Sequence, residues 1–267
     1  MSLLWPNQLL VVLSNEHVAV LYRSGFTKRV IHQQAISITQ GGWQACLTQL
    51  QADLSNLQIE SGTQLSISLA SDLVRYMVLP AQAIFMSAAD KRAYARAAFV
   101  DMFGTAVADW QISCDDAPPH QPTIAAAMDT ALYNALQQLA AQQHAILSTL
   151  QPYAATVLNR CSERIGNQDA LLAIVEHKRL LLIQLSRGRC QQIRSHKTAG
   201  DWQHTLQEIL ARARMLDAPT TQTVFVYAPL HTGALMTSAQ GWQLKKIALA
   251  NPSKPSSASL AMLEALA

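Results

Sequence analysis

The sequence predicts an α/β protein with mixed sheets, built from two similar lobes and an inserted block. Two observations support this fold class. The order of three strand-like runs, one helix-like run and a further strand occurs twice along the 267 residues, with polar or glycine-containing turn residues between the strand-like runs. A block of different character separates the two copies. We therefore predict a duplicated fold of two β-β-β-α-β lobes.

The first copy occupies the N-terminal part of the chain. Its strands are expected at residues 9–13, 18–22, 26–38 and 63–69, with a helix at 43–57 before the last strand. Polar residues 14–17 separate the first two strands, and Gly25 belongs to the turn before the third. Apolar runs joined by such short turns are typical of a β-meander.

The inserted block begins with a strand that Pro80 closes, because proline cannot continue a sheet. Ser87 and Asp90 form a capping-box pattern, and an apolar stripe then continues to Gly104, which predicts a helix over this span. A short strand is expected at Trp110.

Asp115 and Asp116 lie next to two prolines in a predicted loop. Two neighbouring carboxylates invite a catalytic interpretation. Aspartate is also common in proline-rich turns because its side chain bonds to the nearby backbone. The turn is the interpretation that we favour.

The second copy repeats the order of the first. Strands are expected at residues 171–175, 180–185, 190–195 and 221–227, and a helix at 201–216. Arg187 and Gly188 lie in the turn before the third strand. Trp43 and Trp202 open the two equivalent helices, which supports an internal duplication.

The predicted boundaries follow from these copies. The first lobe covers residues 1–150 and includes an inserted subdomain at 71–127, and the second lobe covers 151–250. Residues 251–267 contain a stretch rich in serine and proline, and we expect a flexible C-terminal tail there.

Bulk composition excludes several classes of protein. Half of the residues are hydrophobic and 14% are charged, but no apolar run reaches the 18 residues that a membrane span needs. The N-terminus lacks the basic region of a signal peptide, so we expect a cytoplasmic protein. The four cysteines form no C-x-x-C pair, so no metal site is expected. A net charge of +3 does not indicate nucleic-acid binding.

Common catalytic motifs are absent from the sequence. No phosphate-loop, dinucleotide or nucleophile-elbow pattern occurs. This absence weakens the case for an enzyme in general.

The inserted block carries the closest resemblance to a known family. It contains the strand V-R-Y-M-V-L-P, the helix pattern A-x-x-x-F-x-x-x-F-G from Ala95 to Gly104, and a strand that begins at Trp110. With the paired β-β-β-α-β units, the chain resembles the actin-like ATPase superfamily, whose lobes are RNase H-like. More narrowly it is similar to the type IV pilus assembly protein PilM and the cytoplasmic part of the type II secretion protein GspL.

The resemblance implies nucleotide landmarks from which this chain departs. Members that use ATP place Asp and Gly in the hairpins of both meanders, but here residues 14–17 and 176–179 contain neither. A Gly-Gly pair is expected after the last strand, and the chain has Ala228, Pro229 and Leu230 there. We therefore expect no cofactor, no catalytic residue and no enzymatic activity. The alternative is an active ATPase or small-molecule kinase that uses Mg²⁺ and ATP through Glu16, Glu176 or Asp72.

The resemblance also implies a partner. It suggests a non-catalytic adaptor of a bacterial pilus or secretion assembly at the inner membrane. Such an adaptor would bind the cytoplasmic segment of a PilN-like membrane protein and could form an oligomer. Val74, Tyr76 and Phe99 are the candidates for lining a groove between the first lobe and the inserted block. The alternative, that these residues are ordinary core, remains open.

A small basic patch is the last feature of note. Its members share the region of the second meander: Lys178, Arg179, Arg187, Arg189 and Arg194. The patch could bind an acidic partner or lipid head groups. Edge strands also carry such charges to prevent aggregation, and we favour that explanation from the sequence.

Overall fold

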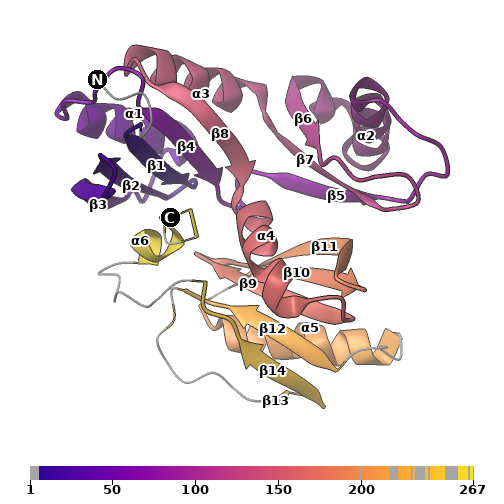
Figure 1. Cartoon of the computed structure of the whole chain (residues 1–267). Helices are drawn as coiled ribbons and strands as arrows, with labels where there is room; N and C mark the ends of the chain where they lie inside the picture. Colours follow the sequence, from indigo (N-terminus) through magenta and orange to yellow (C-terminus); the bar gives the residue numbers. More distant parts are fainter. Residues whose placement is uncertain are drawn as a thin grey trace. The chain divides into compact units, whose positions relative to one another are not determined.

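The chain divides into two compact units (Figure 1). The computed structural model describes residues 6–198, 200–216, 222–229, 231, 238–239, 241–249, 258–263 and 265–266. Unit 1 takes its residues from Met1–Val74, Met128–Thr156 and Ala250–Ala267, and unit 2 from Arg75–Ala127 and Val157–Leu249.

Unit 1 is built on a five-stranded mixed sheet of order β3-β2-β1-β4-β8. Its strands are β1 (Gln8–Leu13), β2 (His17–Ser24), β3 (Arg29–Ser37), β4 (Gln64–Leu69) and β8 (Ile146–Pro152). β1 pairs antiparallel with β2 and parallel with β4, so the meander continues into a parallel half. Consecutive residues of β1 are buried, as expected for a central strand that is covered on both faces.

Helices cover both faces of this sheet. Figure 1 shows α1 (Gly42–Ser55) and α3 (Thr130–Gln142) on one face and α6 (Ala258–Leu263) on the other. α1 buries Cys46, Leu47, Leu50 and Leu54, which lie three or four residues apart on one side of the helix.

α6 differs from the expected flexible tail. It contacts β1, β2 and β3, and Leu260, Met262 and Leu263 are buried. The serine- and proline-rich composition that suggested flexibility belongs mainly to residues 251–257, which lie outside the described residues. The apolar residues that follow form a helix because they can bury against the sheet.

Unit 2 contains a six-stranded mixed sheet of order β11-β10-β9-β12-β14-β13. The strands are β9 (Ala170–Glu176), β10 (Arg179–Ser186), β11 (Arg189–Lys197), β12 (Thr223–Tyr227), β13 (Ser238–Ala239) and β14 (Trp242–Lys246). α5 (Trp202–Leu216) packs Trp202, Leu206 and Leu210 into the same core cluster as Leu180 and Leu182 of β10. α4 (Tyr153–Ile165) precedes β9, and the division between the two units falls within it.

The predicted duplication is confirmed. Each copy has the order β-β-β-α-β, with β1, β2, β3, α1 and β4 in the first copy and β9, β10, β11, α5 and β12 in the second. Arg187 and Gly188 join β10 to β11 with φ values of 50° and 72°, the left-handed conformation that a two-residue hairpin turn requires.

The inserted block forms a small antiparallel sheet covered by a helix. Its elements are β5 (Arg75–Leu79), α2 (Ala88–Phe103), the 3₁₀ segment η1 (Gly104–Asp109), β6 (Trp110–Cys114) and β7 (Thr123–Asp129), with strand order β5-β7-β6. The predicted capping box is present, because the Ser87 side chain accepts from the Asp90 backbone and the Asp90 side chain accepts from the Ser87 backbone. Residues 115–120 form a loop, and Asp115 Oδ1 accepts from the Ile124 amide, which is a backbone role.

The grouping of this block differs from the expected domain boundaries. From Arg75 onward it belongs to unit 2 and not to the unit that contains the first meander. β5 contacts β11, and the Arg189 side chain donates a hydrogen bond to the Gln121 side chain. These contacts join residues far apart in sequence, so a boundary drawn from sequence order could not anticipate them.

Candidate functional site

The β1–β2 turn is the first position where an actin-like protein would be expected to meet phosphate. Here the Ser14 side chain closes the turn: its Oγ accepts from the His17 amide at 2.8 Å and from the Glu16 amide at 3.2 Å. The Ser14 amide itself donates to the His17 carbonyl at 2.8 Å. These backbone donors therefore already have acceptors within the turn.

Asp72 engages the remaining donor of the turn. The Asn15 amide donates to Asp72 Oδ2 at 2.9 Å, and the Asn15 side chain donates to the Asp72 carbonyl at 3.4 Å. A carboxylate thus occupies the place where the turn amide could donate to an anionic ligand, and its negative charge opposes the approach of phosphate. Because Asp72 follows β4 and Asn15 follows β1, the parallel pairing of these strands brings the two residues together.

Buried Cys46 lies within the electrostatic influence of this turn. Burial, together with the negative charges of Asp72 and Glu16, raises the pKa of its thiol to about 11. The two carboxylates make the turn electronegative, which is the opposite of a phosphate cradle.

The second meander also lacks an open turn. His177 and Lys178 alone separate β9 from β10, and Lys178 has a φ of 56°. The Lys178 carbonyl accepts from the Thr198 amide at 2.9 Å. Glu176 at the end of β9 is only 3% exposed, so its carboxylate has little access to solvent.

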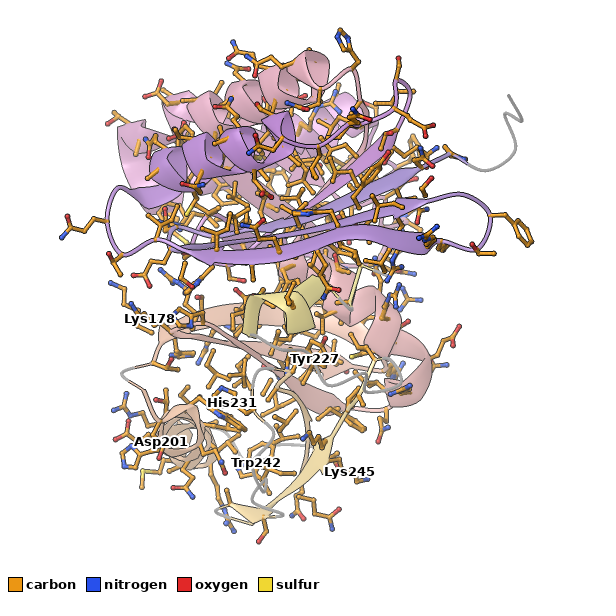
Figure 2. All side chains as sticks on the ribbon, turned by 90° about the vertical axis from the view of Figure 1, so that its left-hand side faces the viewer. Lys178, Asp201, Tyr227, His231, Trp242 and Lys245 are labelled. Atoms are coloured by element: carbon orange, nitrogen blue, oxygen red, sulfur yellow. The ribbon has the colours of Figure 1, made fainter. Side chains whose placement is uncertain are left out.

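Ala228 and His231 are described residues at the third position, the turn after β12. Ala228 is buried in the core cluster beneath α5, and the His231 amide donates to its carbonyl at 3.2 Å. The His231 ring lies 5.4 Å from the Trp202 ring. Figure 2 marks Tyr227, His231 and Asp201, which come from the end of β12, the segment after it and the residue before α5. Leu230, which completed the sequence prediction at this turn, lies outside the described residues.

His231 is in an environment that favours its neutral form. Burial lowers the pKa of its imidazole, and the positive charge of Lys246 lowers it further. A neutral ring tilted against the indole lies at the strand end without offering a cationic contact to phosphate.

The predicted partner residues lie at different depths. Phe99 is fully buried in the core of the inserted block, with its ring 5.9 Å from Phe103 and 6.0 Å from Trp110. Val74 is 4% exposed in unit 1, whereas Tyr76 is partly buried on β5 of unit 2. The burial of Val74 and Phe99 favours the core alternative for these two, and Tyr76 remains the candidate for contact with a partner.

One exposed apolar feature was missed from the sequence. Ile84 and Phe85 are 71% and 80% exposed in the loop between β5 and α2. They border a shallow depression whose lining also includes Met86, Pro118 and Pro119. The available signal was two large apolar residues in a segment that begins after Pro80 and ends at the Ser87 cap. Neighbouring exposed apolar side chains of this kind are typical of protein-binding surfaces.

The comparisons with known proteins identify the fold of the chain but do not assign it to a family. No family model matches the chain, and no curated protein matches it. None of the helices in the described part of the chain is long and apolar enough to cross a membrane.

Three solved structures resemble the chain over most of its length. The PilM–PilN type IV pilus biogenesis complex matches with a TM-score of 0.66 and 11% identity, covering 97% of this chain and 97% of the other. The cytoplasmic domain of EpsL, an inner membrane component of the type II secretion system of Vibrio cholerae, matches with a TM-score of 0.58 and 13% identity, covering 97% and 94%. A Bacteroides thetaiotaomicron protein of unknown function matches with a TM-score of 0.58 and 12% identity, covering 83% and 80%.

These similarities define the class of fold. The Bacteroides protein is described as having an actin-like ATPase fold, and our chain shares that fold, with two mixed sheets and a small antiparallel insert. Two of the three structures are components of pilus or secretion systems, and both are matched at nearly full length.

Proposed function

We propose that the protein is a non-catalytic adaptor of a type IV pilus or type II secretion-like assembly. The observation that carries this proposal is the closed β1–β2 turn, in which the Asn15 amide donates to Asp72 and the amides of Glu16 and His17 donate to Ser14. A fold that hosts nucleotide in active ATPases here has its phosphate-facing donors satisfied by its own side chains. In this proposal the fold is retained as a scaffold for contacts with other proteins.

The proposed partner is the cytoplasmic segment of a PilN-like inner-membrane protein. Support comes from the PilM–PilN complex, whose PilM-like fold this chain shares at 11% identity, and from the inner membrane role named for EpsL. In this proposal the protein is cytoplasmic and attached to the inner membrane through that partner. The exposed Ile84 and Phe85 give the inserted block an apolar surface for such a contact.

Nucleotide binding is the first test. A ligand at about a hundred times its dissociation constant stabilises a protein by roughly 2.7 kcal/mol. We expect millimolar MgATP to leave the melting temperature unchanged. A clear upward shift would instead support the ATPase or kinase alternative.

Partner binding is the second test. A peptide covering the cytoplasmic segment of the membrane protein encoded beside this gene would be titrated against the wild type, Tyr76→Ala and Phe85→Ala. We expect weaker binding by the variants, whereas Met215→Ala should bind normally because it removes an 86% exposed apolar side chain from α5. If neither the wild type nor any variant binds the peptide, this partner is wrong.

A further inference from the structure

A cluster of basic side chains lies between β11 and α5 of unit 2. In the β10–β11 pairing, Arg194 is opposite Leu182 and His196 is opposite Leu180. Leu180 and Leu182 belong to the core cluster beneath α5. Because directly paired residues project from the same face of a sheet, Arg194 and His196 lie on the face that α5 covers.

Arg212 contributes from the helix. It is exposed on α5, next to Ala213 and one turn after Ile209, both of which pack against the core cluster. The positive charges of Arg194 and Arg212 both act on His196: burial lowers the pKa of the imidazole, and these two charges lower it further. Both arginines thus act electrostatically on the same imidazole, and Arg194 and His196 share one face at the edge of the sheet.

In the described part of the chain no ion pair compensates the charge of this group; Glu208, the acid one turn before Arg212 on α5, lies 3.8 Å from His204 instead. Within the described ranges, neither Arg194 nor Arg212 forms an ion pair, and the Nε2 atom of His196 is buried without a hydrogen-bond partner. Like charges held together at an edge destabilise the free protein, and an orphaned buried nitrogen adds to that cost. Both features point to a ligand that supplies negative charge and hydrogen-bond acceptors.

The first copy of the duplication provides an internal contrast. Asp53 of α1 and Arg212 of α5 each lie ten residues after the tryptophan that opens the helix, from 43 to 53 and from 202 to 212. Asp53 Oδ2 lies 3.1 Å from His32 Nε2 of β3, so the helix of unit 1 supplies a carboxylate to its own edge strand. The same helix position in unit 2 has the opposite sign and adds to the positive charge.

The donor set indicates the chemistry of the ligand. One guanidinium can already saturate the two oxygens of a carboxylate with paired hydrogen bonds. Two guanidinium groups and an imidazole offer more donors than a carboxylate needs, and a phosphate group has the oxygens and the charge to engage all three. We propose that Arg194, His196 and Arg212 form a binding site for a phosphate group, carried by an anionic lipid head group or by a soluble phosphate. The site is separate from the β1–β2 turn, and it does not depend on the adaptor function.

The test compares two sources of phosphate on the full-length chain. Flotation would measure binding to phosphatidylglycerol vesicles, with phosphatidylcholine vesicles as the neutral reference, and thermal shift would measure binding of inorganic phosphate. Arg194→Gln with Arg212→Gln removes both charges from exposed positions. Arg187→Gln is the matched control, since it removes an exposed arginine from the β10–β11 turn, which precedes β11 and lies at the other end of that strand from His196.

We expect the double variant to lose about tenfold or more in affinity, as the removal of charge-assisted hydrogen bonds predicts, and Arg187→Gln to bind like the wild type. Binding to phosphatidylglycerol alone identifies a lipid head group, and a response to inorganic phosphate identifies a soluble ligand. An equal loss of affinity in Arg187→Gln would mean that binding reflects general charge attraction, and it would contradict a specific site. Absence of binding to both probes, or tighter binding of a poly-glutamate peptide than of either, would overturn the proposal.

Discussion

At the scale of single residues, Asp72 connects two parts of the chain that the sequence separates by 57 positions. Its carboxylate satisfies a turn amide and at the same time makes the turn electronegative. One acidic side chain thus serves the stability of unit 1 and opposes phosphate binding there.

Replacing Asp72 tests the first of these effects. Asp72→Ala leaves the Asn15 amide without its acceptor, and we expect a loss of about 1–3 kcal/mol in the free energy of unfolding. Asp72→Asn keeps an oxygen acceptor and should lose less. Asp116→Ala serves as the control, because that aspartate is fully exposed and its ion pair with Lys91 is open to solvent. Urea unfolding measures all three, and equal stability of Asp72→Ala and wild type would contradict the described hydrogen bond.

Ionisation of the buried Cys161 thiol should make the stability of the protein depend on pH. Burial raises the pKa of its thiol from 9.0 to about 12, so the unfolded chain ionises this group at lower pH than the folded protein does. The contribution of the neutral Cys161 thiol to the free energy of unfolding is fully present below pH 9. It is lost as the pH rises towards 12, by about 1.4 kcal/mol for each pH unit. Unfolding between pH 9.5 and 10.5 should therefore show a shallower pH dependence in Cys161→Ala than in wild type. Ser162→Ala, which alters an exposed neighbour, should keep the wild-type slope.

At the scale of elements, α6 is the clearest case of a segment stabilised by its packing. Six residues are too few for a stable isolated helix in water. The helix exists because Leu260, Met262 and Leu263 are buried in unit 1, where α6 contacts β1, β2 and β3.

Truncating one buried side chain of α6 tests how much the helix stabilises unit 1. Leu263 is 2% exposed, so Leu263→Ala should lower the free energy of unfolding by about 2 kcal/mol or more. Met215→Ala, at an 86% exposed position, should stay within about 0.5 kcal/mol of wild type. If Leu263→Ala is as stable as Met215→Ala when measured by urea unfolding, the C-terminal segment does not pack as described.

At the scale of the whole molecule, we consider the three landmarks, which are the turns where the resemblance implies contacts to nucleotide. Each landmark is closed by different residues. Ser14 and Asp72 close the β1–β2 turn in unit 1, a two-residue hairpin closes the second meander, and Ala228 and His231 lie at the position after β12. These positions belong to both units, and we expect each of them to oppose nucleotide binding.

Opening one landmark should therefore not restore nucleotide binding. We expect Asp72→Ala to show no thermal stabilisation by millimolar MgATP, because the other two landmarks stay closed. The same protein without nucleotide is the reference for the shift. A gain of binding in this variant alone would mean that Asp72 is a single block in an otherwise competent site.

The sequence by itself determined the repeated order of strands and helices. That order depends on local chemistry: apolar runs form strands, Arg187 and Gly188 adopt the left-handed turn, and Ser87 with Asp90 caps α2. It also determined that both meander turns lack the Asp and Gly of an active ATPase, because residue identity is sufficient for that inference.

Only the tertiary structure decided which distant residues meet. The parallel pairing of β1 and β4 brings Asp72 to Asn15, the register of β10 and β11 aligns Arg194 with His196, and the packing of α5 adds Arg212. The burial of Phe99 and the packing of α6 are of the same kind. Local patterns give the length and face of each element, whereas these contacts depend on how the faces of different elements are matched, and that matching is set by the packing of the complete core.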